Sequence, residues 1–175
     1  MIKNLIELTK VRIGFLVLMT TVIGFYLGSN GDIIYDLLIF TVAGTLMSST
    51  GASVLNNVFE VDNDSKMDRT KHRVLPTKKI SKTFALFLGI FLIISGLITL
   101  YFKVNLLTTI LSFVTITLYL FIYTPLKQIS WLNTSVGAIP GAIPPLGGWT
   151  AATNQVELGG IALFLILFFW QHPHF

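Results

Sequence analysis

Long runs of apolar residues, separated by short polar segments, dominate the pattern of the chain. The runs cover residues 11–28, 33–55, 83–102, 105–124, 134–152 and 157–175. A helix needs about 20 apolar residues to cross the roughly 30 Å hydrocarbon core of a bilayer, and each run is close to that length. The pattern therefore predicts an all-α fold, a polytopic bundle of about six transmembrane helices that forms a single membrane domain over residues 1–175.

One polar segment is much longer than the others. Residues 56–82, NNVFEVDNDSKMDRTKHRVLPTKKISK, lie between the second and third runs and are predicted to form a loop rich in acidic and basic side chains. The runs themselves are almost free of charge, Asp36 excepted. A transporter more typically carries ionisable residues near the bilayer midplane, so we expect a functional site in the loop instead.

The basic residues are distributed unequally between the two sides of the predicted membrane domain. With the N-terminus in the cytoplasm, all of them except Lys103 fall on the cytoplasmic side. Positively charged loops of membrane proteins favour that side. The distribution therefore predicts a cytoplasmic N-terminus and a cytoplasmic loop at residues 56–82.

Composition supports the membrane interpretation and removes other classes of protein. Hydrophobic residues make up 53% of the chain and charged residues only 11%, too few to cover so much apolar surface in water. The net charge of +4 does not indicate nucleic-acid binding, because the basic residues lie between apolar runs rather than along one face. Without cysteine the chain has no disulfide and no thiolate ligand, so a metal ion would need oxygen or histidine ligands.

Polar residues recur at every fourth position from the start of the loop: Asn56, Glu60, Asp64 and Asp68. If the second helix continues past the membrane edge, this spacing places their side chains on one helix face. Carboxylates at this spacing destabilise a helix by roughly 0.2–0.5 kcal/mol per pair, so they favour a compensating cation. Mg²⁺ fits, because it takes one or two protein carboxylates and completes its shell with waters and substrate phosphates. The stripe therefore predicts a magnesium-dependent diphosphate site.

Basic residues follow the acidic stripe directly. Arg69, Lys71 and Arg73 can bind phosphate oxygens that the metal does not reach, and arginine can do so with two parallel hydrogen bonds. Tyr123 and Lys127, one helical turn apart at the cytoplasmic end of the fourth run, can add a further phosphate contact. These residues extend the predicted diphosphate site beyond the loop.

Other interpretations of the same residues remain open. The loop can be a solvated segment whose basic side chains follow the positive-inside rule and bind anionic lipids, with the acidic residues balancing their charge. Tyr123 and Lys127 can equally be an interfacial aromatic residue and a snorkelling anchor. The glycines and prolines of residues 134–152 are interpreted as sites of close helix packing rather than of catalysis.

Several motifs together resemble one protein family. The Asp-rich motif Asn-Asp-x-x-Asp-x-x-x-Asp corresponds here to Asn56, Asn57, Glu60 and Asp64, and KMDRTKHR follows it. The strings TKVRIGFLVLMTTVIG, YTPLK, GAIPGAIPPLGGW and WQHPHF extend the match over nearly the whole chain. In these motifs the chain resembles the UbiA superfamily of intramembrane prenyltransferases, and its paired asparagines resemble the haem-modifying branch. Glu60 departs from the usual aspartate, so the metal position is expected to shift slightly.

The resemblance implies a chemistry for these residues. The expected substrates are farnesyl diphosphate and haem B, the expected product is haem O for terminal oxidases, and the expected cofactor is Mg²⁺ in two or more copies. Asn56, Glu60 and Asp64 are expected to be catalytic metal ligands, with Asp68 in an outer supporting role. The diphosphate is expected to contact Arg69, Lys71, Arg73, Tyr123 and Lys127.

The resemblance leaves two other functions open. A sister prenyltransferase would share the diphosphate site but act on an aromatic acid or quinone precursor. A membrane transport or assembly protein would give no prenyl product at all. For the haem branch, the expected partners besides the lipid bilayer are a downstream haem-modifying enzyme or the oxidase assembly machinery, and no nucleic acid.

The resemblance also implies a larger protein. The family fold is a bundle of about nine helices with a second acidic motif after the sixth helix, whereas this sequence stops at Phe175. The chain is thus expected to be the N-terminal part of a multi-pass protein of the bacterial inner (plasma) membrane. With half of the metal site missing, it is expected to be inactive by itself.

Overall fold

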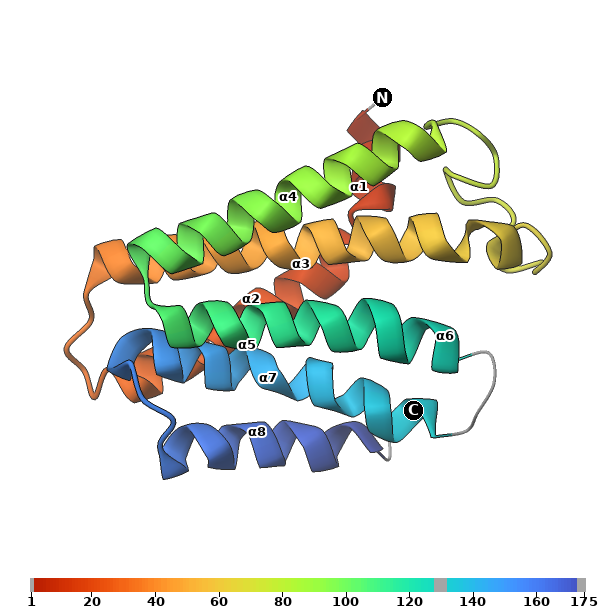
Figure 1. Ribbon diagram of the computed structural model, residues 1–175. Helices are drawn as coiled ribbons and strands as arrows, with labels where there is room; N and C mark the ends of the chain where they lie inside the picture. The colour runs from red at the N-terminus through yellow and green to blue at the C-terminus, as the bar shows by residue number, and fades with distance from the viewer. Residues whose placement is uncertain (1, 128–131, 173–175) are drawn as a thin grey trace.

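The computed structural model describes residues 2–127 and 132–172, and every regular element within these ranges is a helix. The elements are α1 (Ile2–Leu8), α2 (Val11–Gly28), α3 (Tyr35–Asp64), α4 (Lys82–Lys103), α5 (Leu106–Thr117), the π-helix η1 (Leu118–Tyr123), α6 (Thr124–Leu126), α7 (Asn133–Thr153) and α8 (Leu158–Gln171). The long helices form a bundle with their connecting loops at its two ends (Figure 1). The predicted all-α fold is confirmed.

Each predicted apolar run forms a helix. Among the described residues, four helical segments are long and apolar enough to cross a membrane by length and composition: α2, α3, α4 and the continuous stretch Leu106–Leu126 made of α5, η1 and α6. The fifth run forms α7, with 21 residues, and the sixth forms the shorter apolar helix α8, with 14. Residues 173–175 of the sixth run lie outside the described residues. The chain is a multi-pass membrane protein.

The polar segment of residues 56–82 is partly helical, which corrects the prediction that all of it is a loop. Helix α3 has 30 residues, about 45 Å at 1.5 Å per residue, and it runs through Asp64. Only residues 65–81 connect α3 to α4. The helix continues because the polar side chains on its last turns find partners inside the bundle, whereas hydropathy alone ends the helix at its last apolar stretch.

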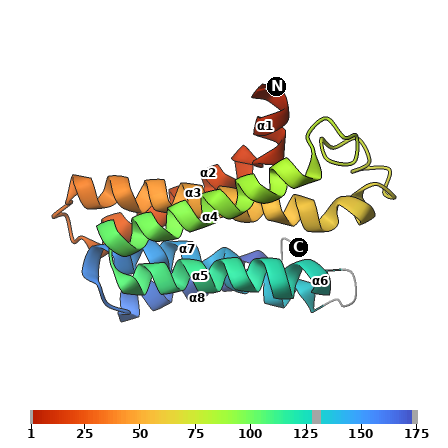
Figure 2. The same ribbon diagram turned by 45° about the horizontal axis from the view of Figure 1, so that its top comes forward.

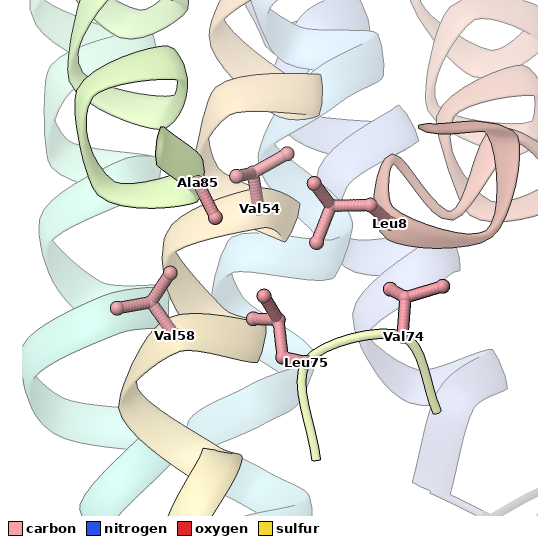
Figure 3. Close-up of a cluster of buried hydrophobic side chains, with 6 residues drawn as sticks. All are labelled: Leu8, Val54, Val58, Val74, Leu75 and Ala85. Carbon is pink, nitrogen blue, oxygen red and sulfur yellow. The ribbon is translucent and has the colours of Figure 1, made fainter. Parts of the chain in front are cut away.

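Buried apolar side chains fasten the N-terminal helix and the loop of residues 65–81 to the bundle. Helix α1, which the apolar pattern does not predict, has seven residues and stands at a steep angle to the long helices (Figure 2). Side chains from α1, α3, the loop and α4 point toward one another (Figure 3) and are at most 5% exposed: Leu8, Val54, Val58, Val74, Leu75 and Ala85. Burial of each valine or leucine contributes roughly 1.5–3 kcal/mol. We call this set the anchoring cluster.

At the opposite end of the bundle, α2 and α7 meet through their backbones. A Cβ atom on Gly24 would collide with the carbonyl group of Pro145, and one on Gly148 would collide with the carbonyl oxygen of Thr21. Small residues let helices approach this closely in membranes. The packing interpretation of the Gly- and Pro-rich run is confirmed at these contacts.

Candidate functional site

A cavity of about 1010 Å³ lies inside the bundle, between α2, α3, α5 and α7. Small-molecule sites typically have roughly 300–1,000 Å³, so this cavity has room for a substrate with a long tail. Its charged lining residues all lie at the end of the bundle that carries α1 and the loop: Glu7, Lys10, Arg12, Asp64, Arg69, Arg73 and Lys127. Five of the seven are basic. This end, which we call the cavity mouth, therefore favours an anionic ligand.

The last turns of α3 bring three polar residues to this end of the bundle, of which Asn56 and Asp64 line the cavity and Glu60 does not. Asn56, Glu60 and Asp64 are 2%, 5% and 5% exposed, although all three are hydrophilic. Their spacing of four places them on one side of the helix, and α3 continues through Asp64. The predicted stripe is therefore present for three residues and faces the inside of the bundle.

Both carboxylates of this face are paired with cations from distant parts of the chain. Lys127, directly after α6, places its Nζ 3.2 Å from Oε1 of Glu60. Arg73 of the loop places Nη1 2.8 Å from Oδ2 of Asp64. An unpaired buried carboxylate would be strongly unfavourable, so each pair holds its segment against α3.

Asn56 is held between two further elements. Lys10, directly before α2, donates a hydrogen bond of 2.6 Å from Nζ to Oδ1 of Asn56. Nδ2 of Asn56 donates to Oγ1 of Thr124 in α6, at 3.0 Å. The amide thereby joins the beginning of α2 to the end of the fourth apolar run.

Lys10 is a residue of the mouth that the sequence analysis did not single out. Its backbone is left-handed, with φ 49° and ψ 48°, a conformation that costs a non-glycine residue roughly 1–2 kcal/mol. Burial lowers the pKa of Lys10 to about 8. Glu60 and Asp64 oppose this change, whereas Arg73 and Lys127 add to it. Its position beside the first apolar run was the available signal, but that position is also explained by membrane topology.

Asn57 carries a buried oxygen atom without a partner. Its Nδ2 donates to the backbone carbonyl of Leu8 at 2.8 Å, whereas Oδ1 accepts no hydrogen bond. Within the described part of the chain, no other buried side-chain nitrogen or oxygen atom lacks a hydrogen-bond partner. Asn57 also lines the cavity. Because an unpaired buried acceptor is unfavourable by roughly 1–3 kcal/mol, this oxygen is a place for a cation or a donor group.

Asp68 and Lys71 are not brought into the cavity. Helix α3 ends at Asp64, so Asp68 cannot continue its face, and the side chain of Asp68 is 97% exposed. Lys71 binds it at 2.6 Å across the loop surface. The predicted stripe of four residues is therefore wrong at its last member. By contrast, Arg69 and Arg73 of the same loop do line the cavity.

Tyr123 forms part of the cavity wall beside Lys127. Its ring stacks on that of Tyr119 with centroids 5.7 Å apart and planes tilted by 18°. The ring also covers Gly137 of α7, where a Cβ atom would lie 2.6 Å from Cε2 of the tyrosine. Both tyrosines line the cavity, so they face the interior of the bundle and not only its surface.

The inner part of the cavity is apolar in character despite its hydroxyl groups. Thr21 donates to the carbonyl of Val17 at 2.9 Å, and Thr115 donates to that of Leu111 at 2.7 Å. These hydroxyls thereby use their donors within their own helices and leave mainly carbon atoms at the wall. A basic mouth with such an interior suits an amphiphile with an anionic head and a hydrocarbon tail.

Comparisons with known proteins agree with this chemistry. The model of the UbiA prenyltransferase family matches residues 17–175. A mitochondrial protoheme IX farnesyltransferase of Arabidopsis thaliana is 44% identical over 97% of this chain and 39% of its own length. A protoheme IX farnesyltransferase of Solibacter usitatus is 41% identical over 99% of this chain and 62% of its own. The chain therefore spans less than two thirds of the length of these curated relatives.

A solved structure shares the fold. It belongs to work on a digeranylgeranylglyceryl phosphate synthase and superposes with a TM-score of 0.86 over 97% of this chain and 59% of its own. At 19% sequence identity this likeness concerns the fold alone. It shows that the arrangement of helices around the cavity occurs in another membrane protein.

Proposed function

The chain belongs to the UbiA prenyltransferase family, and on this basis we propose that it forms the prenyl-diphosphate site of an enzyme that transfers a farnesyl group from farnesyl diphosphate to a vinyl group of haem B, giving haem O. Relatives at 41–44% identity carry the name protoheme IX farnesyltransferase. The observation that carries the proposal is the cavity, because its basic mouth and apolar interior match the two ends of a prenyl diphosphate.

The basic residues of the mouth hold the diphosphate in this proposal. Arg73 reaches the buried carboxylates of α3 from the loop, and Lys127 reaches them from directly after α6. Both line the cavity, so a diphosphate at the mouth can contact both cations. Arginine can bind a phosphate through two parallel hydrogen bonds, and lysine acts as a point charge. Lys10 adds a third cation from the beginning of α2. Tyr123 lies beside them in the wall and closes the space next to the first carbons of the tail.

Mg²⁺ is part of the proposal, because the oxygen atoms of the mouth suit it. No group of three acidic or histidine side chains that could hold a metal alone occurs among the described residues. Mg²⁺ commonly uses only one or two carboxylates and takes its other ligands from water and substrate phosphates. Glu60 and Asp64 would supply the carboxylates and Asn56 an amide oxygen, and the unpaired Oδ1 of Asn57 is a further candidate ligand because Asn57 lines the same cavity. When bound, Mg²⁺ supplies positive charge that stabilises the departing diphosphate.

The chain's own residues have two tasks during the transfer. The cations at the mouth retain the diphosphate, which leaves with the electron pair of the allylic carbon–oxygen bond. The apolar wall keeps water from the resulting allylic cation, so that the vinyl group of haem B is the nucleophile that reaches it. The new carbon–carbon bond leaves a cation on the vinyl carbon beside the porphyrin ring, and this cation adds one water molecule and releases one proton to give the hydroxyl group of haem O. In this proposal the unpaired Oδ1 of Asn57 and the paired carboxylates serve the departure of the diphosphate and not proton abstraction from the acceptor.

The proposal includes an orientation. The mouth lies at the end of the bundle where the basic residues gather, and basic segments favour the cytoplasm. The N-terminus and the loop of residues 65–81 would then face the cytoplasm of a bacterial cell, with the bundle in its plasma membrane. Farnesyl diphosphate, a water-soluble head on an apolar tail, would enter from that side. A downstream haem-modifying enzyme or oxidase assembly machinery would receive the product.

A binding measurement on the chain itself is the first test. The protein in lipid nanodiscs is titrated with radiolabelled farnesyl diphosphate in the presence of Mg²⁺ or of a chelator. We expect saturable binding that depends on Mg²⁺ and that excess inorganic diphosphate weakens. Binding that is equal with and without Mg²⁺ would remove the metal from the proposal, and no binding at all would contradict the proposed function.

Product analysis identifies the acceptor. Membranes with the complete reading frame, and membranes with this chain alone, are incubated with haem B, farnesyl diphosphate and Mg²⁺, and the extracted haems are analysed by mass spectrometry. From the family's second acidic motif we expect no haem O with this chain alone, so its formation would show that one motif suffices. A farnesylated quinone precursor in a parallel incubation would instead favour a sister prenyltransferase.

A further inference from the structure

The cavity has a defined inner end. Its lining follows α2 as far as Thr21 and α5 back to Thr108, and at this depth it also includes Leu100 from the end of α4. One turn farther from the mouth, Phe25 and Thr150 are 1% and 0% exposed and do not line the cavity. The interior therefore stops at this level.

Leu100 is the largest side chain of this inner end. It is fully buried, and it lies across Gly44 of α3, where a Cβ atom would be only 2.7 Å from Cγ of the leucine. The glycine makes room for the leucine, which reaches from α4 over α3 to the cavity. Behind it, the hydroxyls of Thr108 and Thr150 form a buried hydrogen bond of 3.1 Å between α5 and α7. Residues of α4, α5 and α7 thus form the end wall, and they are closely packed there.

The length of the cavity can be compared with that of a prenyl chain. Asn56 at the mouth and Gly44 at the inner end are twelve residues apart on α3, about 18 Å at 1.5 Å per residue. The main chain of a farnesyl group, staggered with bonds of about 1.5 Å, is roughly 14 Å long, and a fourth isoprene unit extends it to roughly 19 Å. This span is roughly 4 Å longer than the three-unit chain and roughly 1 Å shorter than the four-unit chain, so a fourth unit would meet Leu100 at the inner end.

From this geometry we infer that Leu100 sets the prenyl-chain length that the cavity accepts, by closing its inner end against any chain longer than three isoprene units. The inference rests on the proposed function, because it assumes that the diphosphate lies at the mouth and the tail points inward. The wall chemistry agrees with an inward tail, since Thr21 and Thr115 donate to their own helices and need no polar ligand. Leu100 is a specificity-determining residue that never approaches the reacting atoms.

The test compares three ligands and two forms of the protein. Radiolabelled geranyl, farnesyl and geranylgeranyl diphosphate are titrated, with Mg²⁺, into nanodiscs that contain the wild-type chain or Leu100→Ala. For the wild type we expect geranylgeranyl diphosphate to bind at least about tenfold more weakly than farnesyl diphosphate, because forcing extra carbon atoms against a packed wall resembles overpacking a core. In Leu100→Ala we expect the two affinities to agree within about threefold, because the cavity that the substitution leaves admits the fourth unit.

Two further variants keep the comparison clear. Leu100→Val removes less volume and is expected to shift the preference in the same direction by a smaller factor, so the test survives if Leu100→Ala does not fold. Ile98→Ala, on the lipid-facing side of the same helix, is a matched control because its side chain is 52% exposed and does not line the cavity. Its ratio of affinities should equal that of the wild type.

The possible results separate the inference from the function on which it rests. Equal wild-type affinity for farnesyl and geranylgeranyl diphosphate would overturn the inference, because the tail would then leave the cavity sideways between helices. An unchanged preference in both Leu100 variants, with farnesyl diphosphate still bound, would also overturn it and leave the proposed function intact. Failure of the wild type to bind any of the three diphosphates would instead remove the function itself.

Discussion

Lys10 brings its ammonium group to the cavity mouth from a left-handed backbone position. Glycine would adopt this backbone conformation without strain, but the chain has a lysine there. The lysine side chain donates a hydrogen bond of 2.6 Å to Asn56. Strained positions of this kind persist where the surrounding structure holds them, and they cluster at functional sites. Together with the unpaired oxygen of Asn57, this residue marks the mouth as a place arranged for a ligand rather than for stability alone.

The pKa of Lys10 leads to a prediction about pH. Burial lowers that pKa to about 8, so the ammonium loses its proton as the pH rises through this value and the mouth loses one positive charge. Diphosphate binding should therefore weaken above pH 8, by about 10- to 100-fold if the contact is worth a charged hydrogen bond. Equilibrium binding at pH values on both sides of 8 measures the effect. Lys10→Arg keeps its charge and should flatten the profile, and a flat wild-type profile would contradict the prediction.

Removal of either buried carboxylate charge should abolish the dependence of binding on Mg²⁺. Glu60→Gln and Asp64→Asn keep the size of the side chain but supply a weaker metal ligand and leave Lys127 or Arg73 without its partner. We expect farnesyl diphosphate affinity measured with Mg²⁺ to fall by about 10- to 100-fold, while the protein stays in the membrane fraction. Lys103→Ala, at the far end of α4, should bind as the wild type does. Unchanged affinity in both carboxylate variants would remove these residues from the site.

Sequence spacing predicts part of the mouth and misses the rest for physical reasons. The interval of four residues correctly places Asn56, Glu60 and Asp64 on one face, because an α-helix repeats every 3.6 residues. The same interval wrongly includes Asp68, because spacing alone does not show that the helix ends at Asp64. Lys10 lies 46 residues from Asn56, and a contact over that separation exists only after the bundle has formed.

At the scale of elements, the loop of residues 65–81 depends on the anchoring cluster for its position. It contains no regular helix of its own, yet it carries Arg69 and Arg73 to the cavity. Val74 and Leu75 follow directly and are buried against α1, α3 and α4 (Figure 3). The burial of Val74 and Leu75 thus positions the two arginines that precede them. The sequence shows Val74 and Leu75 as an apolar pair directly after Arg73, but it does not show that Leu8 is their partner.

Leu75→Ala should release this loop without unfolding the bundle. A buried leucine replaced by alanine costs about 2–5 kcal/mol, and here the loss falls on the contacts between the loop and α3. Hydrogen exchange should become faster at residues 65–81 and stay unchanged in α7, and diphosphate affinity should fall because Arg73 is no longer held. Lys79→Ala, an exposed change in the same loop, is the control. Equal protection of the loop in both variants would show that the cluster does not hold it.

Neighbouring glycines of α7 should respond to alanine in opposite directions. Gly148→Ala places a methyl group against the backbone of Thr21, so we expect a loss of at least about 1–3 kcal/mol and a lower thermal midpoint in detergent. Gly147 has open space at its Cβ position, and alanine there should stabilise the helix by up to about 1 kcal/mol. The thermal midpoints of the two variants are measured and compared with that of the wild type. A similar midpoint for both would show that α2 and α7 can separate at low cost.

At the scale of the whole molecule, the bundle is tight at one end and open at the other. The α2–α7 backbone contacts and the end wall at Leu100 close one end. The loop of residues 65–81 lies at the other end (Figure 1), and the charged residues of the cavity mouth lie on that side. Hydropathy predicts the number and order of the apolar helices well, because each follows from local composition. It carries no information on which helices separate to form a cavity, since that depends on side-chain volumes at contacts distant in sequence.

The orientation of this asymmetric bundle can be measured directly because the chain has no cysteine. Lys66→Cys places a thiol in the loop at the mouth, and Asp32→Cys places one in the connection between α2 and α3. A membrane-impermeant maleimide applied to intact cells should label Asp32→Cys alone, and permeabilised cells should give both labels. The reverse result in intact cells would place the mouth outside and exclude entry of the diphosphate from the cytoplasm.

The ion pair between Glu60 and Lys127 has a consequence for how the protein is made. Its two members are 67 residues apart, so at roughly 5–20 residues per second the carboxylate leaves the ribosome about 3–13 s before its cation. The interval between the synthesis of Asp64 and that of its partner Arg73 is much shorter, because they are only nine residues apart. During the longer interval the last turns of α3 have to stay in water at the membrane surface, and they can enter the bundle only when the fourth apolar run has been inserted. The contact between Glu60 and Lys127 can therefore form only after the fourth apolar run has been synthesised.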